Sequence, residues 1–326
     1  MAQDLPRPTD NAFLGASLYG QAMEPNYAGA LSFLRRRYSR DLAGIDAAVW
    51  GVPLDAAVSN RPGARFGPRA IRAASAILDG DPAYPFAFDP FAALAVVDYG
   101  DCVWDYGRPE TIAPEIERQA ALILRTGTHL VSLGGDHFIT YPLLKAHAAR
   151  HGALALVQFD SHQDTWPDDG RRTDHATMIA RAVAEGLIRA DRSIQVGIRA
   201  HAPSRHGIEV VFAEDAADLG VPAVAERIRR RVGDAKAYLS FDIDALDPAF
   251  APGTGTPVCG GLSTREALGM LRRVLDLDFV GMDVVEVSPP YDHAEVTALA
   301  AATLAQYYLC GLAAKRGAAP MKELGS

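Results

Sequence analysis

Two apolar runs in this sequence each end in a dense group of acidic and imidazole side chains. The runs cover residues 153–159 and 237–241, and each is typical of a buried strand. The side chains that follow are Asp160, His162 and Asp164 after the first run, and Asp242 and Asp244 after the second. Carboxylates gathered in one cleft repel one another unless cations lie among them. The two motifs therefore predict a metal site.

Apolar runs that suit strands alternate along the chain with patterns that suit helices. Most of the runs are apolar throughout, as expected where helices cover both faces of a sheet. They cover residues 48–52, 94–97, 130–133, 154–159, 194–198, 209–212, 238–241 and 280–287. The helical patterns cover residues 69–77, 114–124, 141–148, 222–232, 265–274 and 294–314. The alternation predicts an α/β fold with a parallel sheet between two helical layers.

The sequence predicts one domain preceded by an arm. Residues 1–40 contain Pro6, Pro8 and Pro25 and are expected to form an irregular N-terminal arm. No internal repeat and no long polar linker divides the rest of the chain. Residues 41–326 are therefore expected to form a single domain, since α/β domains reach this length.

Composition narrows the classes of partner. The net charge of -8 at pH 7 and the pI near 5.6 argue against a nucleic-acid partner. The three cysteines are too few and too scattered for a disulfide framework. No apolar stretch is expected to cross a bilayer, and the first residues lack the pattern of a signal peptide. We expect a cytoplasmic protein without a membrane partner.

Polar side chains at the ends of four predicted strands point to one edge of the sheet. They are His137, Asp160, Asp242 and Glu286. Ligands of open α/β sheets bind beyond the carboxyl ends of the strands. Glu286 lies in the apolar segment 284–287, where a buried carboxylate is costly unless it meets a cation. That cation is either an internal arginine or a substrate.

Six side chains are candidate metal ligands: His137, Asp160, His162, Asp164, Asp242 and Asp244. A set rich in carboxylates suits Mn²⁺ better than Zn²⁺. Its four aspartates would balance the charge of two divalent ions. In an extended strand Asp160 and Asp164 would stand about 13 Å apart, so the chain must curl at Ser161. Taken alone, His137 also suits a packed or helix-capping histidine, and the aspartates at 242 and 244 also suit turns.

Four segments resemble the ureohydrolases, the family of arginase, agmatinase and their relatives. They are residues 134–137 (GGDH), 160–164 (DSHQD), 240–244 (SFDID) and 247–262. The likeness covers residues 51–314, and residues 281–302 most resemble bacterial agmatinases. It implies a three-layer α-β-α fold with an eight-stranded, mostly parallel sheet. It also implies two Mn²⁺ ions per subunit, bridged by a hydroxide that attacks a guanidinium carbon and releases urea and an amine.

The resemblance also assigns roles to individual residues. One ion would be held by His137, Asp160, Asp164 and Asp242, and the other by Asp160, His162, Asp242 and Asp244. Ni²⁺ or Co²⁺ would fit the same ligands. His175 matches the proton-transferring histidine and Glu286 the carboxylate that binds the guanidinium, while Asp136 would orient ligands. Ser161, Gln163 and the loop 166–173 depart from the usual family pattern.

The loop 166–173 is expected to border the distal end of the substrate. Asp168 and Asp169 suit an ammonium group, whereas Arg171 and Arg172 suit a carboxylate, and each also suits a solvated loop charge. We expect agmatine as the substrate, giving urea and putrescine for polyamine biosynthesis. The alternative is a guanidino acid, either 4-guanidinobutyrate or 3-guanidinopropionate.

The resemblance also bears on assembly and on rival classes of protein. Relatives form trimers or hexamers, so a homo-oligomer is expected. A non-catalytic metal-binding relative would lack a ligand, His175 or Glu286, and all are present. A deacetylase with a single zinc would need fewer ligands. A subunit that works only together with a paralogue remains as a remote alternative.

Overall fold

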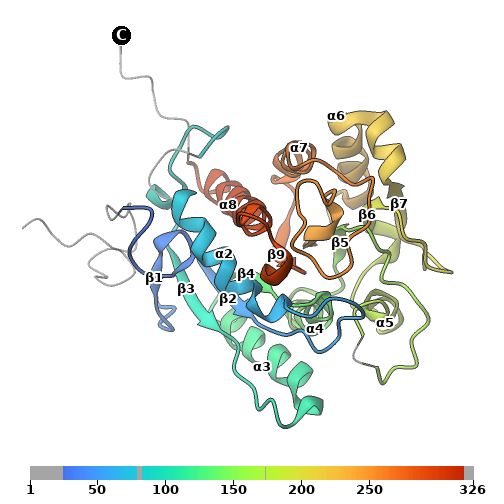
Figure 1. The fold of residues 1–326 in the computed structure, drawn as a ribbon, viewed down its shortest axis with the longest axis horizontal. Helices are drawn as coiled ribbons and strands as arrows, with labels where there is room; N and C mark the ends of the chain where they lie inside the picture. The colour runs from blue at the N-terminus through green and yellow to red at the C-terminus, as the bar shows by residue number, and fades with distance from the viewer. Residues whose placement is uncertain (1–24, 79–82, 173, 319–326) are drawn as a thin grey trace, which may run out of the picture.

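A parallel β-sheet of nine strands runs through the centre of the molecule (Figure 1). The computed structural model describes residues 25–78, 83–172 and 174–318. Within these residues the strand order is β1-β3-β2-β4-β9-β8-β5-β6-β7, and every neighbouring pair is parallel. The strands are β1 (Arg37–Tyr38), β2 (Ala47–Val52), β3 (Val96–Asp101), β4 (His129–Gly134), β5 (Ala155–Phe159), β6 (Ile194–Ile198), β7 (Glu209–Phe212), β8 (Ala237–Asp242) and β9 (Phe279–Val285).

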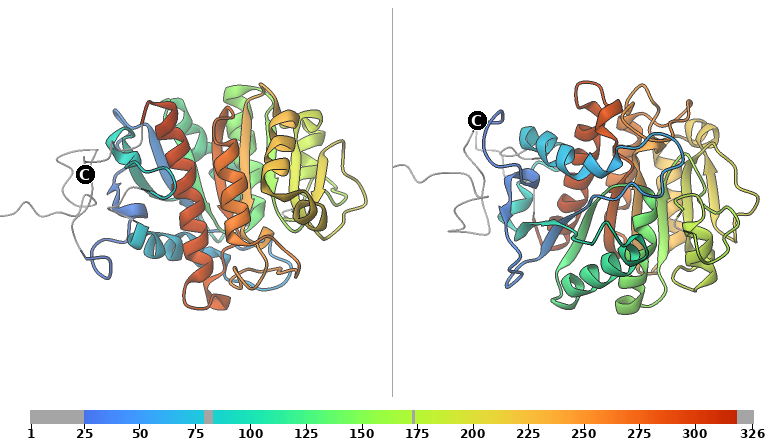
Figure 2. Two further views of the ribbon diagram at one scale, coloured as in Figure 1. Left: turned by 90° about the horizontal axis from the view of Figure 1, so that it is seen from above. Right: turned by 60° about the horizontal axis from the view of Figure 1, so that its bottom comes forward.

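Helices cover both faces of this sheet (Figure 2). One layer consists of α2 (Gly67–Ser75), α6 (Ala213–Val232), α7 (Thr264–Val274) and α8 (Val296–Lys315). The other consists of α3 (Ile112–Arg125), α4 (Thr140–His151) and α5 (Met178–Ala184). The first layer contributes Ile71, Ile228, Leu271 and Leu304 to one buried cluster, and the second contributes Ile116, Leu144 and Ile179 to another. The sheet is therefore buried on both faces, which explains why its strands are apolar throughout.

The central strands end at the same level of the sheet. Leu133 of β4 lies opposite Val284 of β9, and Phe241 of β8 lies opposite both Val284 and Phe159 of β5. Because parallel strands in this register reach one edge together, the residues that follow them emerge side by side. This edge positions the candidate site.

The predicted α/β class and the predicted layers are confirmed, with nine strands in place of the eight expected. β1 is a two-residue strand inside the segment 1–40, and nearby Phe33 and Leu34 are fully buried. Residues 1–24 of that segment lie outside the described part of the chain. Helix α5 has no counterpart among the predicted helices. Residues 222–232 form only the second part of α6, which bends at Gly220, where φ is 75°.

Helix α8 is long and apolar enough, by length and composition, to cross a membrane. The expectation that no stretch of the sequence is long and apolar enough to span a bilayer was therefore wrong. However, fourteen of the 20 residues of α8 are buried, and most of its leucines, tyrosines and alanines belong to the core beside α2 and α7. Its apolar character is accounted for by the packing of the domain.

Candidate metal centre

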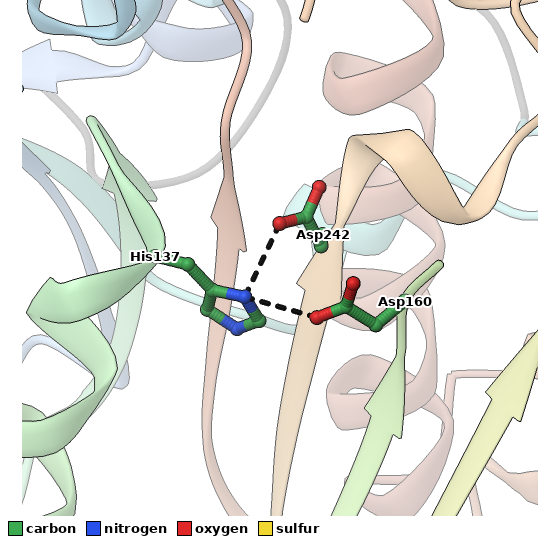
Figure 3. Close-up of side chains that lie close together, drawn as sticks. All are labelled: His137, Asp160 and Asp242. Atoms are coloured by element: carbon green, nitrogen blue, oxygen red, sulfur yellow. Dashed lines mark ion pairs between the residues drawn. The ribbon is translucent and has the colours of Figure 1, made fainter. Parts of the chain in front are cut away.

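His137 and three aspartates converge beyond the carboxyl edge of the sheet. The Nδ1 atom of His137 lies 3.1 Å from Asp160 Oδ2, 3.0 Å from Asp164 Oδ2 and 3.2 Å from Asp242 Oδ2. Figure 3 shows His137 facing Asp242 and Asp160, which come from the ends of the adjacent strands β8 and β5, across β9 from His137. All four residues are buried. Their segments follow β4, β5 and β8, so the common edge of the sheet brings them together.

The surroundings of His137 determine which nitrogen of its ring carries the proton. The Oγ–H of Ser240 donates to Asp283 Oδ1 at 2.7 Å, and Tyr238 and Thr140 also donate to the Asp283 carboxylate. Ser240 Oγ also lies 3.4 Å from Thr140 Oγ1 and 2.8 Å from His137 Nε2. Because the Ser240 hydrogen is directed at Asp283, His137 Nε2 must donate. In the neutral ring Nδ1 then carries no proton, and its lone pair faces three carboxylate oxygens.

That arrangement fits a cation. Within the described residues the buried His137 Nδ1 forms no hydrogen bond, although three carboxylate oxygens lie 3.0 to 3.2 Å from it. A lone pair among carboxylates is unfavourable by itself, whereas a divalent ion accepts all four donors. The residues present therefore suit a bound metal.

A second group of possible ligands shares one residue with the first. Asp160, His162 and Asp244 offer ligand atoms that all lie within 4.8 Å of one another. His162 Nδ1 is 3.0 Å from Asp244 Oδ2 and 3.5 Å from Asp160 Oδ1. Asp160 thus faces the first group with Oδ2 and the second with Oδ1. Asp242 belongs to the first group, and its Oδ1 accepts the N–H of Asp244 at 2.8 Å.

The path of the chain after β5 explains how three ligands converge within five residues. Ser161 donates to Asp244 Oδ1 from both its N–H and its hydroxyl, at 3.0 and 2.8 Å, which draws this segment toward β8. Asp164 has a φ of 51°, in the left-handed region that few non-glycine residues adopt. The curl predicted at Ser161 is thus completed at Asp164, and strain of this kind often accompanies a functional site.

Crowding of the carboxylates shifts their protonation. Burial raises the pKa of Asp242 well above its usual value, and the charges of Asp244 and Asp160 add to that effect. Burial and Asp160 likewise raise the pKa of Asp164 to about 6. Burial opposes protonation of His137, but the three aspartates outweigh it and hold its pKa well above the usual value. The protein without metal therefore retains protons that a bound cation would replace.

Glu286 lies beside this centre with one oxygen unpartnered. Its Oε1 accepts the N–H of His137 at 2.8 Å and lies 3.3 Å from Nδ1 of His175. Its Oε2 is buried and has no hydrogen-bond partner among the described residues. Gly255 faces this oxygen, and a Cβ there would approach it to 3.3 Å. No internal arginine meets Glu286 in the described part of the chain, and its charged neighbour there is His175.

The structure places other candidate residues around this core. Asp136 is fully buried, and its carboxylate accepts the N–H groups of Ala57 and Phe138 at 3.0 Å each. His175 contacts Glu286 on one side of its ring and Ser59 Oγ, at 2.9 Å from Nε2, on the other. Ser59 was missed in the sequence because 116 residues separate it from His175 and no local pattern marks it.

The charged loop residues already have partners within the protein. Asp168 pairs with Arg181 of α5 at 2.7 Å, and Arg172 pairs with Asp174 at 2.7 Å. Asp169 Oδ1 accepts the N–H groups of Arg171 and Arg172. Thr173, at the end of the predicted loop, lies outside the described residues. The ion pairs of the loop thus connect it to the segments that follow it.

Known proteins are similar to this chain in sequence and in fold. The model of the arginase family matches residues 45–311. A curated agmatinase from Chromobacterium violaceum is 54% identical over 303 residues, which cover 92% of this chain and 94% of that protein. Agmatinase from Neisseria meningitidis serogroup C is 49% identical over 261 residues, covering 80% of this chain and 85% of the relative.

Solved structures of similar enzymes have the same fold as this chain. A hypothetical agmatinase from Burkholderia thailandensis superposes with a TM-score of 0.93 at 50% identity, covering 94% of this chain and 98% of that one. The proclavaminate amidino hydrolase from Streptomyces clavuligerus gives a TM-score of 0.84 at 39% identity, with coverages of 89% and 99%. The chain belongs to the arginase family, and it is a metal-dependent amidinohydrolase that acts on a small guanidino substrate.

Proposed function

We propose that this enzyme hydrolyses agmatine to putrescine and urea with two Mn²⁺ ions in each subunit. The observation that carries the proposal is the unpartnered Glu286 Oε2 beside two ligand groups that share Asp160. A guanidinium bound to that oxygen would present its carbon to the metal centre. The names of the relatives that cover most of this chain support agmatine as the guanidino compound.

His137, Asp160, Asp164 and Asp242 would hold one ion, and Asp160, His162, Asp242 and Asp244 the other. When bound, the two ions would supply a water activated near neutral pH. Asp160 has an oxygen directed at each group, which favours it as a bridging ligand. The same role for Asp242 rests on the family resemblance. Asp136 would act indirectly, by holding the loop after β2 and the turn that carries His137.

Glu286 and His175 would act on the substrate. The ionised Glu286 carboxylate would bind the guanidinium by charge-assisted hydrogen bonds. His175 would transfer a proton to the leaving amine. Burial lowers its pKa, but Glu286 outweighs this effect and raises it to about 9, so the ring holds a proton to donate at neutral pH. Its place 3.3 Å from Glu286 Oε1 puts it beside the bound group.

The distal ammonium of agmatine would lie toward the loop 166–172. Asp168 and Asp169 would attract it, whereas Arg172 would be required for a guanidino acid. Because Arg172 already pairs with Asp174, a substrate carboxylate would have to compete with that aspartate. An ammonium at Asp168 would likewise compete with Arg181. The choice of the amine over 4-guanidinobutyrate and 3-guanidinopropionate therefore rests on the relatives named agmatinase.

The remaining proposals concern the protein in the cell. We infer a role in polyamine biosynthesis, a cytoplasmic location and a homo-oligomer, trimeric or hexameric. We also propose that residues 41–326 form one catalytic domain. Purification of the chain alone, followed by size measurement and a urea assay, tests whether it needs a paralogous subunit.

Urea release from a panel of guanidino compounds tests the proposed reaction. The purified enzyme is assayed on agmatine, arginine, 4-guanidinobutyrate and 3-guanidinopropionate, with and without added Mn²⁺. We expect the highest kcat/KM for agmatine and no turnover after chelation. A higher kcat/KM for either acid would overturn the substrate, and a loss of that preference in Arg172→Ala would identify the residue responsible.

A further inference from the structure

Ser59 lies in the loop between β2 and α2 and reaches into the site through its side chain. Its Oγ is 2.9 Å from Nε2 of His175, while Nδ1 of the same ring is 3.3 Å from Glu286 Oε1. Both nitrogens of the imidazole therefore have a partner. His175 is buried, whereas Ser59 is exposed at the surface of the loop.

Hydrogen bonds fasten this loop on both sides of Ser59. Before it, the N–H of Ala57 donates to Asp136 Oδ2 at 3.0 Å. After it, Asn60 Nδ2 and the N–H of Arg61 donate to the carbonyl of Gly255, at 2.8 and 3.4 Å. Asp136 precedes His137, and Gly255 faces Glu286 Oε2. The position of Ser59 is thus set by the same segments that form the site.

Glu286 selects the tautomer of His175, and Ser59 fixes the ring in the orientation that keeps Nδ1 against Glu286. An ionised carboxylate can only accept, so the proton of the neutral ring belongs on Nδ1, toward Glu286. Nε2 then has a lone pair, to which the Ser59 hydroxyl donates. When the ring gains a second proton, Nε2–H donates to the same oxygen, because a hydroxyl both donates and accepts. Ser59 can therefore hold the ring in either protonation state.

We propose that Ser59 is a positioning residue for His175 and keeps its imidazole in the Nδ1–H tautomer and in one orientation during hydrolysis. The inference rests on the proposed proton-transfer role of His175. A misoriented proton donor slows the reaction without weakening the binding of a substrate held by other groups. The Ser59 hydroxyl should accordingly affect kcat more than KM.

Kinetics of the metal-loaded, full-length enzyme on agmatine test this role. Ser59→Ala should lower kcat by about 10–100-fold and change KM by less than about threefold. Ser59→Thr keeps the hydroxyl and should recover most of the rate, whereas Ser59→Cys, a poor donor, should behave like alanine. Ser39→Ala is the matched control, since that hydroxyl bonds the backbone of Asp41 beside β1.

Combining variants separates this inference from the proposed function. His175→Ala should lose rate, and adding Ser59→Ala to it should cause no further loss, because both act through one group. If His175→Ala retains full turnover, the proposed role of His175 fails. If His175→Ala is slow but Ser59→Ala keeps the wild-type kcat, the inference about Ser59 is overturned and the proposed function stands.

The tautomer itself gives a readout that does not depend on turnover. In protein with ¹⁵N-labelled histidine, the His175 signals are identified by their absence from His175→Ala. The spectra are recorded above pH 9, where the ring is neutral. We expect the Nδ1–H tautomer in the wild type and in Ser59→Thr, and a mixture with Nε2–H in Ser59→Ala and Ser59→Cys, in which the ring is free to turn away from Glu286. An unchanged tautomer in both of these variants contradicts the proposal, even if a variant has lost stability.

Discussion

Asp168 and Arg181 form a bidentate ion pair that connects the loop 166–172 to helix α5. Arg181 Nε lies 2.7 Å from Asp168 Oδ2, and Nη2 lies 2.7 Å from Oδ1. The same Nη2 donates to the carbonyl of Arg172 at 2.6 Å. Both charged side chains are at most 9% exposed, and the guanidinium also lies over the ring of Tyr141. The arginine thereby joins both ends of the loop that borders the site.

Replacing Arg181 by alanine should loosen this loop. We expect KM for agmatine to rise by about tenfold with a smaller change in kcat, and the melting temperature to fall by several degrees, because the change leaves Asp168 unpaired in a nearly buried position. Steady-state kinetics and thermal melting measure the two effects. Asp168→Asn should also raise KM, because it removes both the anchor of the loop and a charge proposed to attract the ammonium. An unchanged or lower KM in Arg181→Ala would contradict the anchoring role of this ion pair.

Metal content should distinguish the shared ligand from the others. Asp160→Asn is expected to lose both ions, because Asp160 faces both ligand groups. Asp164→Asn is its matched control: Asp164 contacts only the first group through His137, so that variant should retain the second ion. Metal analysis per subunit measures both outcomes. A full metal complement in Asp160→Asn, or one ion per active wild-type subunit, would contradict the two-ion assignment.

Glu286→Gln tests the guanidinium site without changing its shape. The amide oxygen can still accept the N–H of His137, but the charge that attracts the substrate is removed. A hydrogen bond between charged groups contributes roughly 1.5–3 kcal/mol, so kcat/KM for agmatine should fall by about 10–100-fold. Metal content should stay unchanged. Equal kcat/KM in the variant and the wild type would show that another group binds the guanidinium.

The stability of the chelated protein should fall as the pH rises from about 6.5 to 8.5. Burial and Glu286 raise the pKa of Asp136 to about 7. Burial lowers the pKa of His175 and His162, but the neighbouring carboxylates outweigh it and raise them to about 9 and about 12. Groups with a raised pKa stabilise the fold below their unfolded pKa and lose that contribution as the pH rises through the folded value.

Other buried histidines do not reverse this trend within the window. Burial lowers the pKa of His129 to about 3 and that of His147 to about 4, so above pH 6.5 both are mainly neutral whether folded or unfolded. Thermal melting in the presence of a chelator measures the slope, and Mn²⁺-loaded protein is the comparison, where the slope should be shallower. A melting temperature that rises with pH in the chelated protein would count against this account.

The metal centre was the part of the molecule most readily predicted from the sequence. Asp160, His162 and Asp164 lie within five residues after β5, while Asp242 is the last residue of β8 and Asp244 lies two residues further on. Side chains in such places are positioned by the sheet, whose strands are marked by unbroken apolar runs. Local sequence therefore determined most of the geometry. The structure brings four of these residues, together with His137, into two groups that share Asp160, and it places Asp164 Oδ2 3.0 Å from His137 Nδ1.

Short elements and long-range contacts could not be predicted in the same way. β1 has two residues and exists as a strand only because Arg37 and Tyr38 pair with β3. α5 is seven residues long, too short for a clear helical pattern. Because α5 was not predicted, Arg181 could not be recognised as the partner of Asp168. Ser59 is a comparable case, since only the tertiary fold brings it to His175.

The turn at Gly135 shows which parts of this enzyme are free to vary. A Cβ on Gly135 would lie 1.8 Å from the carbonyl oxygen of Leu54, and the N–H of Asp136 donates to that oxygen at 2.8 Å. The backbones of two loops are thus interlocked directly behind His137, and a side chain here would displace a ligand. Residues 166–172 carry none of the candidate ligands. Laboratory evolution toward other guanidino compounds should therefore accumulate its substitutions in that loop and leave the interlocked turn unchanged.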